Sequence, residues 1–271
     1  MGWQEIADRV YVWRQPVLDV NTTLVVGETG ALVVDTLATP SQATELAEAV
    51  RHLTPLPWLV VNTHHHFDHA YGNQVFAVQP DCQIWAHPEA ARRLREITPR
   101  TLAALREEWA LTEPALAELT DVTVVPPNRT LRDAASLDLG GRPVELRHFG
   151  RGHTDGDVVV HVPDAGVVVA GDLVEQDGPP GFEDAYPLEW PHTVAGLLHL
   201  ATGPVVPGHG AVTDHDFVKA QHDELNQLAW LIRDGHADDA DPYDVARQAP
   251  FGPDAALVAV RRGYAELSGR T

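Results

Sequence analysis

Short hydrophobic runs separated by turns dominate the first part of the chain. Residues 10–13, 21–26 and 31–35 are rich in β-branched side chains, which is typical of strands. Residues 40–52 instead carry apolar side chains at helical spacing after an N-terminal Pro-Ser pair. Residues 57–62 form an apolar run of strand length. These patterns predict a mixed α/β protein.

The rest of the chain continues this alternation. Strands are predicted at residues 83–86, 122–125, 143–148, 157–162, 166–170 and 204–206. Helices are predicted at residues 88–120 with breaks at Pro99 and Pro114, at 193–200, and from 214 to near the end with a break at 239–242. In each half of the chain, a set of predicted strands is followed by loops that contain histidine. We therefore expect two sheets packed face to face with helices outside.

Composition narrows the range of partners. The chain has 271 residues, is 44% hydrophobic and carries a net charge of −20, with Lys219 as its single lysine. Nucleic acid would be repelled, because no basic stripe offsets this charge. No apolar run approaches the ~18 residues that a membrane-spanning helix needs. The N-terminus lacks a basic region followed by an apolar core, so a cytoplasmic protein is expected, and the single Cys82 excludes an intrachain disulfide.

One short stretch carries most of the candidate chemistry. Residues 63–69 read Thr-His-His-His-Phe-Asp-His, directly after the apolar run 58–61. Imidazole and carboxylate are ligands that suit zinc, iron or manganese. His64, His66, Asp68 and His69 are the candidate ligands. His65 is interpreted as a non-ligand, because adjacent residues in an extended loop point to opposite sides.

Three further segments place a ligand-type residue after a predicted strand. They are Gly152-His153-Thr154, Gly171-Asp172 and Gly208-His209-Gly210. Each pattern alone is typical of a turn. Loops held on a rigid sheet are where sites are usually built, however, and a glycine beside each ligand lets the backbone approach closely. The three segments therefore extend the metal site predicted at residues 63–69.

Together these motifs resemble the metallo-β-lactamase superfamily over roughly residues 8 to 212. The resemblance implies an αββα four-layer sandwich with C-terminal helices, divided into a catalytic domain at 1–212 and a helical extension at 213–271 packed on it. It also implies two zinc ions per chain, with iron or manganese as alternatives. His64, His66 and His153 would bind the first ion, Asp68, His69 and His209 the second, and Asp172 both. Asp35 matches an aspartate that supports the histidine loop from behind.

The expected activity is hydrolysis of a small ester, thioester, lactone or amide by a hydroxide shared between the two metal ions. Asp68 or Asp172 would accept or relay the proton. The sequence motif at residues 63–69 is similar to that of glyoxalase II, but the C-terminal region lacks a matching glutathione-binding motif. Asp172, and a Cys82 outside the ligand positions, argue against a dedicated β-lactamase. A mononuclear iron oxygenase acting on persulfides, β-lactamase activity as a main or side function, and a non-catalytic metal-binding protein remain the alternatives.

Two structural questions stay open at this point. Phe182, Tyr186 and Trp190 make residues 175–190 either a lid or pocket wall, or a loop anchored on the core. Trp109 is a candidate for the opposite wall. The apolar side chains of the C-terminal helices allow a homodimer interface, although packing on the protein's own sandwich is the simpler expectation.

Overall fold

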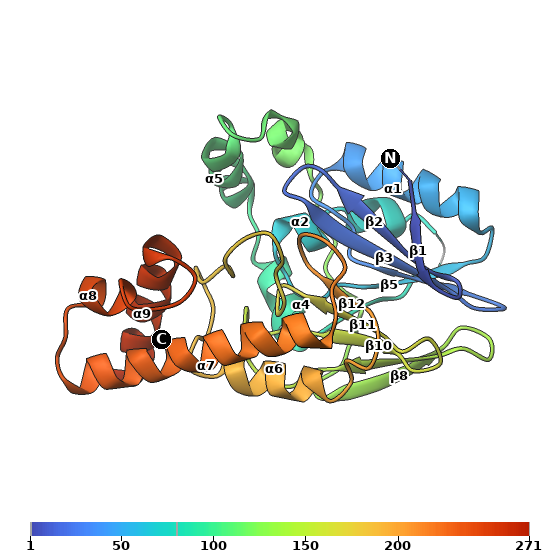
Figure 1. The fold of residues 1–271 in the computed structure, drawn as a ribbon. Coiled ribbons are helices and arrows are strands. Elements are labelled where there is room, and N and C mark those ends of the chain that lie inside the picture. Colours follow the sequence, from blue (N-terminus) through green and yellow to red (C-terminus); the bar gives the residue numbers. More distant parts are fainter. Residues whose placement is uncertain (1, 80, 271) are drawn as a thin grey trace.

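Two β-sheets form the centre of the molecule, and helices cover their outer faces (Figure 1). This is a computed structural model that describes residues 2–79 and 81–270. Within those residues the first sheet has seven strands, ordered by number: β1 (Gln4–Ala7), β2 (Val10–Gln15), β3 (Val20–Val26), β4 (Ala31–Val34), β5 (Trp58–Val61), β6 (Ile84–Ala86) and β7 (Arg129–Thr130). The second sheet has the order β12-β11-β10-β9-β8, with β8 (Ala134–Asp138), β9 (Pro143–Arg147), β10 (Val159–Val162), β11 (Val167–Gly171) and β12 (Val205–Pro207).

The strand directions bring several chain ends to one edge. Strands β4, β5, β6 and β7 run parallel, and β11 runs parallel to β12. Parallel strands end at the same edge of a sheet, so the loops after β4 and β5 meet there. A bridge between Val20 and His209 joins the start of β3 to the loop after β12. The segments that the sequence singles out therefore gather along one edge of the sandwich.

Three apolar layers hold the sandwich together. Between the sheets, buried side chains such as Val12, Leu32 and Val160 interdigitate. The helix α1 (Pro40–Leu53) buries Leu46 and Val50 against the outer face of the first sheet. This is the αββα arrangement that the alternating pattern predicts.

The outer face of the second sheet is covered by α6 (Trp190–Leu198) and α7 (His215–Ala237), which share a buried cluster with Val168. The last helices, α8 (Pro242–Ala246) and α9 (Pro253–Leu267), pack on α7 through Val245 and Val260. Their apolar residues therefore serve mainly the protein's own core, although Tyr243 remains exposed. No described helix is both long enough and apolar enough to cross a membrane.

Some elements differ from those expected. Residues 122–125 form no strand; they follow the 3-10 helix η1 (Pro114–Asp121) and lead into Pro126-Pro127, which has no N–H groups to donate to a ladder. The predicted helical region 88–120 divides at its prolines into α4 (Pro88–Arg95), α5 (Pro99–Trp109) and η1. Strands β1, β7 and β8 were not predicted from the sequence. Their exposed, largely polar residues give no apolar run.

His87 follows β6 and His148 follows β9, and the two imidazole rings stack on each other, with ring centroids 4.1 Å apart. The His87 side chain accepts a hydrogen bond from the backbone N–H of Glu89 at the start of α4. This bond needs a neutral ring nitrogen. Burial, together with the neighbouring His148, lowers the pKa of His87 to about 4.

This pKa makes stability depend on pH. Below the unfolded-state value of about 6.5, the unfolded chain binds a proton that the folded chain does not bind until about pH 4. We expect the free energy of unfolding to fall by about 2–3 kcal/mol from this residue across that window as pH drops. The His87→Asn variant retains a side-chain acceptor at the start of α4 but has no imidazole to titrate. Its free energy of unfolding should therefore lack this pH-dependent loss. Denaturant unfolding of the metal-free protein at several pH values tests this, with His52→Asn as the control; identical pH profiles for wild type and His87→Asn would contradict it.

Candidate functional site

Five histidines and two aspartates converge at the edge where the strands end. One group consists of His64, His66, His153 and Asp172, and a second of Asp68, His69 and His209. Within each group the potential ligand atoms lie within 4.8 Å of one another. The loop after β5 and the short helix α2 (Phe67–Ala70) supply four of these side chains, and the loops before β10 and after β11 and β12 supply the others.

The Asp172 carboxylate lies between the two groups. Its Oδ1 is 3.1 Å from Nε2 of His69. Its Oδ2 is 3.4 Å from Nε2 of His153 and 3.3 Å from Nε2 of His209. A Cβ on Gly208 would overlap Asp172 Oδ1, so only glycine at position 208 lets the two loops approach this closely. One side chain can therefore contact ions held by either group.

Asp35 fixes the histidine loop from behind. It follows β4 in a left-handed conformation with φ 65° and is almost fully buried. Its Oδ1 accepts a hydrogen bond from the Thr63 backbone N–H at 2.8 Å. Its Oδ2 accepts from the Thr63 hydroxyl at 2.8 Å and is 2.9 Å from Nδ1 of His69. The supporting role expected for Asp35 is confirmed by these contacts.

All five histidines share one arrangement: one ring nitrogen contacts an oxygen behind it, and the other faces the centre. The outer contacts are Thr63 Oγ1 for His64, Asp184 Oδ1 for His66, Asp35 Oδ2 for His69, the Gly181 carbonyl for His153 and the Leu18 carbonyl for His209. Such outer partners fix the tautomer and the orientation of a metal-binding imidazole.

The inward-facing atoms fit metal ions. Nε2 of His64 and Oδ1 of Asp172 are buried and lack a hydrogen-bond partner among the described residues. Buried polar atoms are normally satisfied, and a missing partner calls for an explanation. Imidazole and carboxylate donors at this spacing are a donor set for divalent metals. The residues present therefore match a metal centre.

Protonation competes with metal at these residues. Burial opposes the charged form of His209, but the Asp172 and Asp68 carboxylates outweigh burial and raise its pKa to about 10. Burial lowers the pKa of His153 to about 4. An ion bound by His209 would displace a proton, so metal affinity falls as pH decreases.

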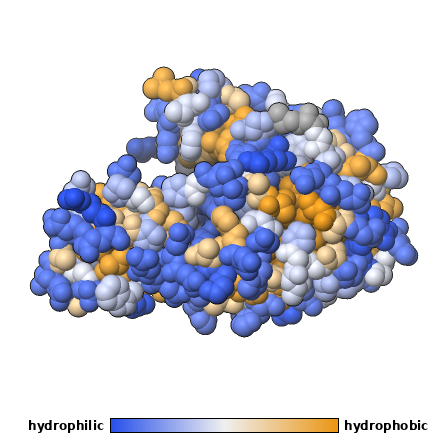
Figure 2. All heavy atoms as spheres, in the orientation of Figure 1, coloured by the Kyte–Doolittle hydropathy of each residue, from blue (hydrophilic) through white to orange (hydrophobic). Residues whose placement is uncertain are grey.

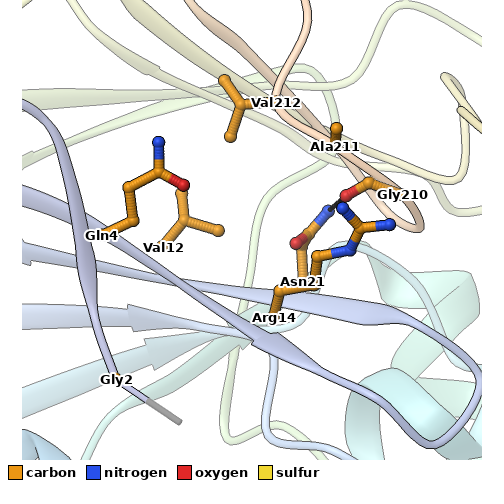
Figure 3. Close-up of a pocket in the computed structure, with 8 residues that line it drawn as sticks. All are labelled: Gly2, Gln4, Val12, Arg14, Asn21, Gly210, Ala211 and Val212. Atoms are coloured by element: carbon orange, nitrogen blue, oxygen red, sulfur yellow. Dashed lines mark hydrogen bonds between the residues drawn. The ribbon is translucent and has the colours of Figure 1, made fainter.

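Asn21 of β3 positions the loop that bears His209. Its side-chain amide donates to the carbonyls of Pro207 and Gly210 at 3.0 Å and 2.8 Å, as drawn in part in Figure 3. The small cavity in Figure 3 has a volume of about 240 Å³ and contains no histidine or carboxylate among its described lining residues. It lies beside a structural contact and does not open onto the clusters.

A larger cavity of about 530 Å³ does open onto them, since its lining includes His66, Asp68, His153, Asp172 and His209. Leu105 and Trp109 of α5 also line it, so the interpretation of Trp109 as a wall is confirmed. Phe182, Tyr186 and Trp190, in contrast, are buried in the core. Trp190 Nε1 donates to the Leu173 carbonyl at 3.2 Å. These three aromatics anchor their loop, and Glu175, Gly181 and Glu183 of the same loop reach the cavity instead.

Asp184 was not predicted from the sequence. Its Oδ1 is 3.1 Å from Nε2 of His66, and its Oδ2 is 3.4 Å from Nε2 of His65. His65, His66 and Asp184 thus form a third group, which shares His66 with the first. His65 lies outside both groups around Asp172, but the third group could also hold a metal ion, so the interpretation of His65 as a non-ligand stays a prediction. No periodicity marks position 184, which lies 118 residues from His66 in an irregular loop.

The Asp184 contact predicts an effect on metal affinity. Asp184→Asn can present its amide group to His66 Nε2 and favour the tautomer with a proton on Nδ1, the nitrogen that faces His153. We expect metal affinity to fall by roughly 10- to 100-fold, the usual consequence of losing such a partner. Competition with a chelator of known affinity measures it, and Asp177→Asn in the same loop is the control. Unchanged affinity in Asp184→Asn would contradict this role.

Comparison with known proteins gives one consistent family. Residues 16–235 match the family model of the metallo-beta-lactamase superfamily. The chain is 34% identical over 89 residues to a metallo-beta-lactamase type 2 of Bacillus sp. (strain 170), covering 31% of this chain and 35% of that protein. It is 30% identical over 130 residues to the acyl-coenzyme A thioesterase MBLAC2 of Homo sapiens, covering 47% of this chain and 45% of that protein. The matches thus span about a third to a half of these curated relatives.

Solved structures agree on the fold. A metallo-beta-lactamase from Pontibacter korlensis superposes with a TM-score of 0.64 at 21% identity, covering 83% of this chain and 98% of that one. The DIM-1 metallo-beta-lactamase superposes with a TM-score of 0.63 at 20% identity, covering 83% and 96%. Such identities establish architecture alone. The family model covers most of the chain, the fold agrees, and the His/Asp clusters suit divalent metal ions. The chain belongs to the metallo-β-lactamase superfamily.

Proposed function

We propose that the protein hydrolyses a small ester, thioester, lactone or amide at a centre of two zinc ions. His64, His66 and His153 would hold one ion, Asp68, His69 and His209 the other, and Asp172 both. The observation that carries this proposal is the position of Asp172, whose two carboxylate oxygens lie 3.1–3.5 Å from histidine nitrogens of both groups.

The chemistry of the donors favours zinc, because neutral imidazole and carboxylate are its usual oxygen and nitrogen ligands. Bound divalent ions supply an acidified water molecule and an electrophile that polarises a carbonyl group. The protein's own residues supply the rest. The outer contacts of the five histidines hold the ligands in one tautomer, which leaves the central atoms preorganised for the ions.

Asp68 and Asp172 are the residues that handle the proton in this proposal. Both line the cavity, so each can accept a proton near the reacting carbonyl carbon. The cavity of about 530 Å³ suits a small molecule, and its apolar side on Leu105 and Trp109 can receive an acyl group. No serine or cysteine nucleophile is needed, and Cys82 is buried elsewhere in the core.

The proposal is tested by measuring the metal content and the hydrolytic activity of the same protein preparation. Protein purified without added metal should contain about two zinc ions per chain, hydrolyse a simple thioester, lose activity on chelation and recover it with zinc. His153→Ala should lose both metal and activity, whereas His52→Ala, outside the clusters, should keep both. About one iron per chain with oxygen consumption on a persulfide would overturn the proposal in favour of the mononuclear oxygenase.

A further inference from the structure

We infer that the site selects acyl substrates by charge: it prefers a cationic or neutral leaving group and disfavours an anionic one. This inference rests on the proposed hydrolase function and adds a substrate class to it. It follows from the acidic side chains that line the cavity beyond the two ligand groups. These are Glu108 and Glu183, together with Glu175, whose pKa burial raises to about 8, so the negative charge lies mainly on Glu108 and Glu183. The described lining residues include neither lysine nor arginine.

The three acidic side chains come from two segments of the chain. Glu108 belongs to α5, and Glu175 and Glu183 belong to the loop after β11. Glu175 is tied in place, since its Oε1 accepts from the Gly181 backbone N–H at 3.0 Å. A Cβ on Gly181 would lie 3.3 Å from Glu183 Oε2, 3.3 Å from His153 Cε1 and 3.7 Å from Glu175 Oε1. Two carboxyl groups therefore converge beside the candidate ligand His153.

The arginine side chains around the same loop already form ion pairs or hydrogen bonds within the protein. Arg14 pairs with Asp19 and Asp177, and Arg151 pairs with Glu189. Arg262 donates to the backbone carbonyls of Asp184 and Ala185. None of these side chains is among the lining residues. A substrate carboxylate or phosphate that lies in the part of the cavity beyond the two ligand groups therefore meets acidic side chains, and no lysine or arginine among the described lining residues can pair with it.

The cavity is also lined by apolar and aromatic side chains. Leu18, Phe67, Leu105 and Trp109 line it, and the Phe67 and Trp109 rings lie 6.0 Å apart between centroids. Such a surface accepts an alkyl chain, and aromatic faces also attract an alkylated ammonium group. On the face of the molecule seen in Figure 2, hydrophilic residues are widespread and hydrophobic residues form smaller areas between them.

Three thioesters with one acyl group and different thiols test this on the metal-loaded enzyme. The hexanoyl thioesters of thiocholine, N-acetylcysteamine and 3-mercaptopropionate carry leaving groups that are cationic, neutral and anionic. In each reaction water forms a C–O bond at the acyl carbon while the C–S bond breaks, giving hexanoate, the thiol and a proton. A thiol-reactive chromophore detects all three products equally. Because the thiols differ in pKa, each kcat/KM is divided by the rate constant for hydroxide hydrolysis of the same ester without enzyme, and the comparisons below use these normalised values.

We expect kcat/KM to be highest for the thiocholine ester, and at least about tenfold lower for the anionic ester than for the neutral one. Added salt should compress these ratios, because it screens charges near the cavity mouth. In Glu108→Gln with Glu183→Gln, the cation-to-anion ratio should fall several-fold. Glu107→Gln, an exposed neighbour on α5 that does not line the cavity, should keep the wild-type ratio.

Equal or faster hydrolysis of the anionic ester by wild type would overturn the inference and leave the hydrolase proposal intact. An unchanged ratio in the double variant would overturn it too. Should no thioester be cleaved, the thioester part of the proposed function fails instead, and calorimetry still decides the charge preference. In that case heptyltrimethylammonium should bind the metal-loaded protein at least about tenfold more tightly than heptane-1-sulfonate, and the reverse order would refute the charge selection.

Discussion

Asp172→Asn should reduce kcat/KM by at least about a thousandfold, beyond the roughly 10–100-fold typical of a lost outer partner. Asparagine keeps the shape of aspartate but has one carbonyl oxygen and no charge, so it cannot present anionic oxygen to both groups. Its amide group must face Nε2 of His69 on one side or the nitrogens of His64, His153 and His209 on the other. Either orientation places a donor where a ligand atom is required.

Metal analysis and kinetics on the same preparation measure this result. We expect at most one zinc ion per chain in Asp172→Asn, against about two in wild type. Asp133→Asn, at an exposed position, is the control for the same chemical change. Two bound ions together with activity within tenfold of wild type would rule out Asp172 as the shared ligand.

Asp35→Asn should have the second-largest effect, although Asp35 lies behind the ligands. Its Oδ1 accepts from the backbone N–H of Thr63, which can only donate, so the asparagine oxygen must take that position. The amide group then faces Nδ1 of His69. It forces the proton of His69 onto Nε2, the atom that faces Asp172, and a protonated nitrogen cannot bind metal.

The expected result is selective loss of metal from the group of Asp68, His69 and His209, with kcat lower by roughly 10²- to 10⁴-fold, as for other tautomer-reversing substitutions. Metal titration should show one tight site in place of two. Thr36→Ser, which alters another buried polar residue near His69, should retain both sites. Two tight sites in Asp35→Asn would show that Asp35 does not set the tautomer.

The strand pattern indicated where ligand-type residues would gather, because these residues follow strands, and the resemblance to the superfamily supplied their division into two groups. Apolar runs such as 58–61 and 166–170 mark strands clearly, and the polar residues after them become neighbours once parallel strands align. Asp35 was identified from the same resemblance. The fold class could be predicted equally well, because buried strands and amphipathic helices leave distinct periodicities.

Contacts made by irregular segments could not be predicted. Asp184 reaches His66 from a loop whose conformation depends on buried anchors such as Phe182 and Trp190. Nothing in the local sequence encodes that placement. At residues 122–125 a strand was predicted that the structure does not contain. Their composition is typical of a strand, but the prolines that follow have no N–H groups to donate to a neighbouring strand. Strand β8 was missed because its residues are mostly exposed and do not form an apolar run.

Leu18 connects substrate accommodation to ligand geometry within a single residue. Its side chain lines the cavity, and its carbonyl holds Nδ1 of His209 at 2.7 Å. Leu18 and Asp19 are both left-handed, with φ 60° and 58°, so this turn has few alternative conformations. Leu105 and Trp109 line the same cavity from a helix that supplies none of the candidate ligands. Substitutions on α5 can therefore change the substrate range with little effect on the candidate ligands. The turn at Leu18 must satisfy two structural requirements at once, so its sequence should diverge slowly.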